Sequence, residues 1–202
     1  TIILDGFSKS YAMTGWRLGW VALPTPGEAA VFKQLNINII SCVPPFIQEA
    51  GREAYENPES RGVVEGMVAE FERRRDWIVP VLNNIEGMKC QMPKGAFYVF
   101  PNIGGICKSL GIVEAYEAMT PEVQARTSPS GMFQMFLLYR YGVATLDRNS
   151  FGSIGAEGQH YLRLSIATSM ENCQEGAARI RTAGGDREGF VRFLEEEKLW
   201  GQ

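Results

Sequence analysis

The stretch TIILDGFSKSYAMTGWRLGW, residues 1–20, decides the fold. Its first four residues, Thr1–Leu4, predict a buried strand, and Leu18–Leu23 predicts a second one after the loop from Asp5 to Gly15. A central strand needs partners for its backbone and for both of its faces. We therefore expect the chain to be the C-terminal piece of a longer polypeptide, with a trimmed N-terminus as the alternative.

The composition around this stretch is that of a globular protein. The 202 residues are 45% apolar and 21% charged, which is typical of one large domain or two small ones. Lys and Arg total 20 and Asp and Glu total 23, so the net charge of -3 predicts no nucleic-acid or anionic-lipid partner. The one dense basic run, Arg73–Arg75, follows Glu70 and Glu72 in a helical pattern and predicts a solvated helix face.

Membrane, export and metal signals are missing from the sequence. The apolar runs are far shorter than the roughly 18 residues of a membrane span, and no leader pattern opens the chain, so we expect a cytoplasmic protein without a membrane partner. The four cysteines form no CxxC pair, and the single histidine, His160, has no nearby ligand residues. We therefore expect neither a metal site nor a disulfide framework.

Further along the chain, helical and strand patterns alternate. Helices are predicted from Pro26, with Phe32, Leu35 and Ile39 on one stripe, over Phe46–Tyr55, and over Ser60–Leu82, where Pro80 should kink or end the helix. Strands are expected over Met88–Gln91, Ala96–Phe100, Gly142–Leu146 and His160–Ala167, a loop over Asp147–Gly158, and helices over Ile112–Met119, Glu122–Arg126, Met132–Tyr141, Glu171–Ala183 and Asp186–Leu199. This order indicates the tail of an α/β unit followed by a small α+β unit.

The loop after the first strand carries the residues with chemical potential. SKS at 8–10 is followed by TGWR at 14–17. Ligands of open α/β sheets bind at strand ends, which places Lys9 where its amine can react, although a loop lysine by itself is more often a solvated surface charge. Arg17 can hold a phosphate dianion through two hydrogen bonds, and its charge favours a neutral amine nearby. Such a set suits a phosphorylated aldehyde cofactor.

The segment GFSKSYAMTGWRLGW, residues 6–20, closely resembles the pyridoxal-phosphate lysine motif of the class I aminotransferases, the fold-type I family that contains aspartate aminotransferase. GAFYVFP at 95–101 is similar to a strand of the family's small domain, and YLRLS at 161–165 resembles the strand whose arginine binds the substrate carboxylate. The resemblance extends from about residue 1 to residue 183. It implies an α/β fold in which residues 1–63 are the C-terminal part of the pyridoxal-phosphate-binding large domain. Residues 64–202 would be the small α+β domain, with a linking helix at about 60–84.

The resemblance also implies the roles of individual residues. Lys9 would be joined covalently to pyridoxal phosphate and, once the substrate displaces it, would move a proton between the substrate Cα and the cofactor. Arg17 matches the phosphate-binding arginine, and Ser8 would lie beside the same phosphate. Many relatives have a serine at the position of Gly6, so one hydroxyl ligand is absent here.

Arg163 can also be argued from its strand. Leu162, Leu164 and Ile166 alternate with Arg163 and its neighbours, so the arginine lies on the face opposite the apolar one. An arginine on a short strand is suited to a bidentate grip on a substrate α-carboxylate. The alternative is an edge-strand arginine that pairs with a surface glutamate.

Other candidates are weaker. We expect Phe97, Tyr98 and Phe100 to be core residues and His160 to be a surface or boundary residue. Asn149–Gly152 occupies the place of a loop that approaches the substrate in relatives, but Asp147-Arg148-Asn149 departs from the commoner proline-glycine turn, which would alter substrate choice. Ser41 and Cys42 fall where family members contact the partner subunit's active site.

The resemblance implies an enzyme of amino acid metabolism and biosynthesis, an aminotransferase that moves an amino group from an L-amino acid to a 2-oxo acid and works as a homodimer. The family's other cofactor contacts precede the lysine, so we expect this chain alone to be inactive. Three alternatives stay open: a pyridoxal-phosphate-dependent lyase or synthase, an aminotransferase-like effector domain of a transcriptional regulator, and an inactive interaction piece. We also expect residues 1 to about 60, without most of their sheet, to expose apolar surface on the order of several hundred Å².

Overall fold

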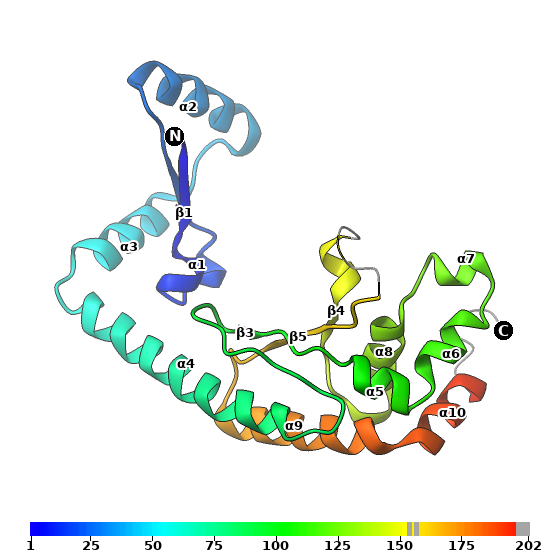
Figure 1. Ribbon diagram of the computed structural model, residues 1–202. Helices are drawn as coiled ribbons and strands as arrows, with labels where there is room; N and C mark the ends of the chain where they lie inside the picture. The colour runs from blue at the N-terminus through cyan, green and yellow to red at the C-terminus, as the bar shows by residue number, and fades with distance from the viewer. Residues whose placement is uncertain (153–154, 156–157, 197–202) are drawn as a thin grey trace. The chain divides into compact units, whose positions relative to one another are not determined.

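The computed structural model describes residues 1–152, 155 and 158–196, and the chain divides into two compact units (Figure 1). The first unit is Thr1–Ala69 and the second is Glu70–Gln202. The boundary lies inside one long helix, α4 (Ser60–Asn83).

The first unit is built on a two-stranded antiparallel sheet. Strand β1 (Ile3–Gly6) pairs with β2 (Gly19–Ala22), and Ile3 lies opposite Ala22. The sequence predicts both strands, although β1 begins two residues later than expected. The prediction that this strand is buried is wrong for the described chain, because β1 pairs with β2 alone there and Leu4 is 75% exposed.

Two helices follow β2, and proline begins each of them as expected. Helix α2 (Pro26–Ile40) starts with a capping box, in which the Glu28 backbone N–H donates to Thr25 Oγ1 and the Thr25 N–H donates to the Glu28 carboxylate. Helix α3 (Pro45–Glu56) also has proline at its first position. The expected apolar stripe of α2 is exposed, as are many apolar side chains of this unit: Ile2, Ile3, Leu4, Trp16, Val31, Phe32, Leu35, Ile39, Ile40 and Phe46. This unit thus exposes many large apolar side chains, in line with the expected open surface.

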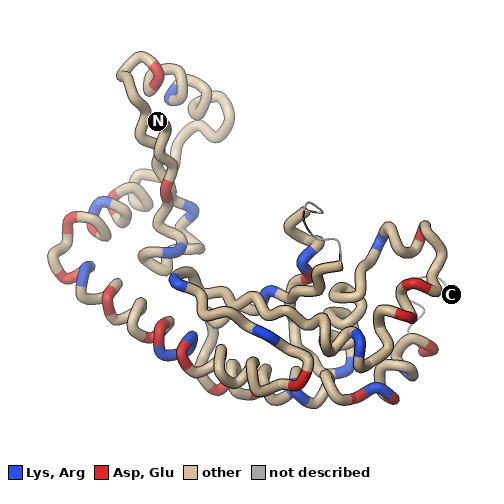
Figure 2. The backbone as a smooth tube through the Cα atoms, in the orientation of Figure 1, with Lys and Arg blue, Asp and Glu red and all other residues tan. Residues whose placement is uncertain are grey.

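Helix α4 carries interspersed charges of both signs from Arg61 to Asp76 (Figure 2). Arg73 and Arg74 both donate to the Glu70 carboxylate at 2.8 Å, and these bonds lower the pKa of Glu70 to about 2. The expected helix is confirmed, but of its three arginines only Arg73 is exposed, because Arg75 is half-buried as well as Arg74. Arg74 is half-buried because its guanidinium also donates to the Ile166 carbonyl at 3.2 Å.

Proline 80 lies inside α4, and the helix ends one turn later at Asn83 rather than at the proline itself. Ile78, Val79 and Leu82 are buried on this last part of the helix. They belong to the core of the second unit.

A three-stranded antiparallel sheet in the order β3-β5-β4 forms the centre of the second unit (Figure 1). Strand β5 (Leu162–Ser165) is central, β3 (Tyr98–Val99) pairs with it through Val99 and Leu164, and β4 (Leu146–Asp147) pairs with it through Leu146 and Arg163. The strand expected over Met88–Gln91 is only an isolated bridge between Lys89 and Asn102. The strand expected over Gly142–Leu146 shortens to β4, because Gly142 takes a left-handed conformation as the cap of the preceding helix.

Helices pack around this sheet. They are α5 (Gly104–Ser109), α6 (Ile112–Glu117), α7 (Pro121–Gln124), α8 (Pro129–Tyr141), α9 (Met170–Gly185) and α10 (Arg187–Glu196). Their shared core includes Leu82, Val99, Ile106, Phe133, Phe136, Leu162, Ile180 and Phe190, all at most 1% exposed. The last residues of the helix expected over Asp186–Leu199, from 197 on, lie outside the described residues, as do 153–154 and 156–157 of the expected Asp147–Gly158 loop.

Two glycine backbones touch in this core, and their contact gives a test of the fold. A Cβ at Gly105 would lie 2.4 Å from the Cα of Gly87, whose carbonyl accepts the Ile106 N–H at 3.2 Å. Gly105→Ala should therefore lower the free energy of unfolding by about 1–3 kcal/mol in urea titrations. Gly176→Ala is the matched control, because open space surrounds that position in α9, and it should raise stability by about 0.5–1 kcal/mol. Shifts of the two variants in the same direction would contradict this packing.

Candidate active-site residues

The predicted cofactor lysine lies on a single helical turn directly after a strand. Strand β1 ends at Gly6, and α1 (Phe7–Ser10) begins at the next residue. Phe7 is 4% exposed, with its ring centroid 4.7 Å from that of Tyr55 and 5.5 Å from that of Tyr11. Because Phe7 occupies the inner side of the turn, Lys9 lies on the solvent side and Ser8 is half-buried.

Helix α3 holds this turn in place through a close approach at Gly51. A Cβ at Gly51 would lie 2.3 Å from the Leu18 side chain and 3.2 Å from the Phe7 ring, so a larger residue here would require both side chains to shift. The Trp20 indole N–H donates to the Tyr55 hydroxyl at 2.6 Å and ties β2 to the same helix. The position of the lysine turn is therefore set by packing within the first unit.

The loop between the lysine and Arg17 contains two non-glycine residues in the left-handed region, Ala12 at φ 55° and Arg17 at φ 54°. Such conformations cost on the order of 1–3 kcal/mol each and concentrate at functional sites. Arg17 follows the short 3-10 helix η1 (Thr14–Trp16), and its guanidinium donates to the Thr14 carbonyl at 3.0 Å. Arg17 is exposed and has a left-handed backbone. It lies on the same segment between β1 and β2 as Lys9.

These residues fit the part of pyridoxal phosphate that they would hold. Lys9 supplies an amine for the aldehyde, while Arg17 and Ser8 supply donors for a phosphate. The one carboxylate that precedes them, Asp5 of β1, accepts the Gly6 N–H at 2.7 Å. The donor set is thus basic and hydroxylic, as a phosphate requires.

Arg163 lies in the second unit, on the central strand. The expected alternation is confirmed, since Leu162, Leu164 and Ile166 are buried while Arg163 is half-buried on the other face. The guanidinium carbon is 4.3 Å from the centre of the Tyr98 ring and 4.9 Å from that of Phe151. The edge-strand alternative is wrong, because β5 is the middle strand and no described carboxylate forms an ion pair with Arg163.

Further aromatic side chains contact Phe151, one of the two rings next to Arg163. The rings of Phe100 and Tyr161 stack with their centroids 5.2 Å apart, and Phe100 meets Phe151 edge to face at 6.2 Å. Phe97 packs against the core as expected, but the same expectation is wrong for Tyr98 and Phe100. The two-residue period along 97–100 could have shown this from the sequence. Tyr98 and Phe100 alternate with the buried Val99 and so lie on the opposite face of the strand.

The remaining candidates are placed without a defined role. Ser41 follows α2 with φ 64°, and Cys42 is exposed. Their contact with a partner subunit stays a prediction. His160 is half-buried, which confirms a boundary position. The other three cysteines are buried free thiols, Cys90, Cys107 and Cys173, and burial raises the pKa of Cys107 to about 12.

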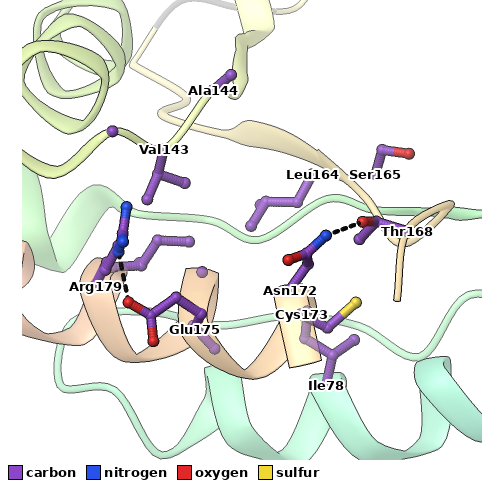
Figure 3. A pocket seen from close by; sticks show the side chains of 14 residues that line it. Ile78, Val143, Ala144, Leu164, Ser165, Thr168, Asn172, Cys173, Glu175 and Arg179 are labelled. Atoms are coloured by element: carbon purple, nitrogen blue, oxygen red, sulfur yellow. Dashed lines mark hydrogen bonds and ion pairs between the residues drawn. The ribbon is translucent and has the colours of Figure 1, made fainter. Parts of the chain in front are cut away.

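Two cavities lie near these residues but not at them. A cavity of about 530 Å³ in the second unit is lined by Leu164 and by residues of α9 such as Asn172 and Glu175, with no predicted site residue in its wall (Figure 3). A smaller one of about 270 Å³ in the first unit is lined by Tyr11 and Met13 of the lysine loop. Across the described ranges, no group of three or more His, Cys, Asp or Glu side chains is arranged to hold a metal ion. None of the described helices has the length and apolar character to cross a membrane.

The two units together define a chain with a strand-end lysine loop and a strand-borne arginine on an α/β scaffold. Residues 1–180 match the family model described as aminotransferase class I and II. The chain belongs to this family of class I and II aminotransferases.

Relatives with known sequences and structures agree. The chain is 39% identical over 183 residues, 91% of its length, to the probable aspartate/prephenate aminotransferase of Aquifex aeolicus. It is 35% identical over 201 residues, 98% of its length, to the aromatic-amino-acid aminotransferase 2 of Thermococcus litoralis. The solved structure of an aromatic aminotransferase from Pyrococcus horikoshii superposes with a TM-score of 0.72 at 32% identity, over 94% of this chain and 44% of that one. The expected fold-type I α/β class is confirmed.

The chain spans only part of these relatives. It covers 41% of the Aquifex aeolicus protein and 42% of the Thermococcus litoralis protein. This chain therefore corresponds to about two fifths of each relative's length.

The single histidine gives a pH-dependent test of the second unit. Burial lowers the pKa of His160, and the nearby Asp147 opposes this only in part. In the unfolded chain His160 takes up a proton near pH 6.5, whereas in the folded chain it does so only at lower pH. The contribution of the neutral imidazole to the free energy of unfolding is therefore complete above pH 6.5 and declines as the pH falls through that value. The one imidazole resonance in NMR titrations should have its midpoint below 6.5. His160→Gln should flatten the decline in stability between about pH 7 and 5.5, and an unchanged slope would contradict the assignment.

Proposed function

We propose that the complete polypeptide carrying this chain is a pyridoxal-phosphate-dependent aminotransferase that moves an amino group from an L-amino acid to a 2-oxo acid. The observation that carries the proposal is that Lys9 and Arg17 lie on one short segment between two paired strands, Lys9 on the turn directly after β1 and Arg17 two residues before β2. Membership of the class I and II aminotransferases supports it, as does the similarity to an aspartate/prephenate aminotransferase and to an aromatic-amino-acid aminotransferase.

Each site residue has a distinct task in this proposal. Pyridoxal phosphate, when bound, supplies the electron-withdrawing ring that stabilises negative charge at the substrate Cα. Lys9 holds the cofactor and afterwards carries the proton that leaves Cα. Arg17 and the Ser8 hydroxyl bind the phosphate, and Arg163 binds the α-carboxylate through two hydrogen bonds.

The residues of the second unit favour this role for Arg163. Its two aromatic neighbours, Tyr98 and Phe151, limit the rotamers of the guanidinium at no electrostatic cost. A carboxylate neighbour would compete with the substrate for the same donors. None is bonded to Arg163 in the described part of the chain, so its donors can serve a substrate.

The same proposal includes a homodimer, a cytoplasmic location and a place in amino acid metabolism. The many exposed apolar side chains of the first unit support an association with further polypeptide, since extensive exposed apolar surface on a soluble protein marks a contact surface. The substrates are small molecules, an amino acid and a 2-oxo acid.

The role of Lys9 is tested with the complete polypeptide, pyridoxal phosphate, L-amino acids and 2-oxoglutarate. Glutamate should form, and after borohydride treatment the peptide that contains Lys9 should carry the mass of the reduced cofactor. Lys9→Ala should abolish both signals, because no other amine takes its place in the loop. Lys33→Ala, an exposed lysine of α2, is the control and should keep both. Pyruvate and ammonia in place of glutamate would identify a lyase and refute the transfer reaction.

The role of Arg163 is tested by comparing substrates with and without a carboxylate. Arg163→Leu should weaken transition-state binding of an amino acid by about 2–5 kcal/mol, because the substrate carboxylate loses its charged partner. The corresponding primary amine should react as before. Arg179→Leu, which breaks an exposed pair with Glu175 in the same unit, is the matched control. Equal losses of kcat/KM for the amino acid and the amine would rule out this role.

A further inference from the structure

A buried carboxylate lies close to the arginine strand without a cationic partner. Asp147, the last residue of β4, is 8% exposed, and no described lysine or arginine forms an ion pair with it. Two hydroxyls satisfy it instead. Ser128 Oγ donates to Oδ2 at 2.9 Å and Ser130 Oγ donates to Oδ1 at 2.5 Å. A buried carboxylate without such donors is strongly unfavourable. The two serine hydroxyls therefore favour this one position of the Asp147 side chain.

Both serines belong to the start of α8, and the contact is reinforced from there. Ser128 caps the helix by accepting the Gly131 N–H at 2.9 Å, and the positive end of the helix dipole favours a carboxylate at this point. The Asp147 backbone N–H donates to the Gln134 side chain at 2.7 Å. Asp147 is thus fixed to one helix through both its side chain and its backbone.

The residues after Asp147 convert this anchor into the position of an aromatic ring. Asp147 begins the short 3-10 turn η2 (Arg148–Phe151), whose first N–H donates to the Tyr161 carbonyl at 3.1 Å. The Arg148 guanidinium donates to the Gly152 carbonyl at 2.8 Å and closes the turn. Phe151, at its end, is 48% exposed and yet lies 4.9 Å from the Arg163 guanidinium. Because Phe151 is held by few core contacts, the backbone bonds of the η2 turn help to define the position of its ring.

We propose that Asp147 is a positioning residue for carboxylate recognition, which holds the η2 turn so that the Phe151 ring fixes the orientation of the Arg163 guanidinium. This inference rests on the proposed function of Arg163 in binding the substrate carboxylate. With Tyr98 and Phe151 against its π face, the guanidinium keeps its N–H edges for two in-plane bonds to a carboxylate. A turn without the anchor lets Phe151 move, and the arginine loses its single orientation.

The test uses the complete polypeptide loaded with pyridoxal phosphate and two readouts. One is the Kd of 3-phenylpropionate, a carboxylate without an amino group, by calorimetry. The other is kcat/KM for an L-amino acid against its decarboxylated amine. Asp147→Ala and Phe151→Leu should each weaken 3-phenylpropionate about tenfold and raise the KM for the amino acid by about the same factor, with the amine unchanged. The double variant should lose no more than the worse single one, because both act through one contact.

Conservative variants separate positioning from general damage. Asp147→Asn should restore the Kd, because its amide can accept from one serine hydroxyl and donate to the other. Thr145→Val is the matched control. It removes a buried hydroxyl that has no partner in the described structure, two residues before Asp147, and should leave the Kd unchanged. If Asp147→Ala does not fold, Ser130→Ala removes one donor only and should give an intermediate Kd.

The outcomes are distinguishable. An unchanged Kd for Asp147→Ala, or an equal loss with the amine, overturns the positioning role even where Arg163→Leu behaves as proposed. If Arg163→Leu itself fails to separate amino acid from amine, the proposed function of that arginine fails first. A weakening by Thr145→Val equal to that of Asp147→Ala also overturns the inference.

Discussion

The alternation of side chains along β5 is the constraint from which the second unit follows. One face of this strand places Leu162, Leu164 and Ile166 in the core, and the register with β3 and β4 then leaves no freedom for the residue between them. Arg163 must lie on the opposite face, because a slip by one position would bury its charge. The Arg74 bond to the Ile166 carbonyl fixes the end of the strand to α4. A hydrophobic requirement thus determines where a polar recognition group lies.

The first unit solves a similar problem with less material. Its two strands have no further partners in the described chain, and a two-stranded sheet in water is marginal by itself. What orders the lysine turn is the cluster of Phe7, Tyr55 and Gly51, where ring packing and a close helix approach replace a sheet core. Conformational strain at Ala12 and Arg17 is maintained by this packing. The lysine turn is packed, whereas the apolar side chains around it are exposed. Relatives more than twice as long as this chain have additional residues that could cover such a surface.

Much of this was predictable from the sequence, and the exceptions have physical causes. The starts of α2 and α3 follow from proline and, in α2, from the Thr25 cap, and the face of Arg163 follows from the two-residue period. The extents of β1 and β4 differ from the expectation for two reasons: strand pairing sets them, which leaves no local signal, and the glycine at 142 is the signal of a helix cap rather than the start of a strand. Tyr98 and Phe151 were missed as neighbours of Arg163, since their contact joins segments far apart in the chain. The sequence shows that Asp147-Arg148 departs from the commoner turn. It does not show that Ser128 and Ser130 donate to Asp147, since these serines lie 17–19 residues away in the chain.

The distribution of thiols has a practical consequence. Cys90, Cys107 and Cys173 are enclosed by the second unit, whereas Cys42 alone faces solvent, just beyond the end of α2. A maleimide dye added to the folded protein would therefore attach at a single, naturally provided point, without any engineered mutation. Fluorescence from that dye would report selectively on the linker between two helices of the first unit, and a second label at a chosen place would turn the molecule into a molecular ruler.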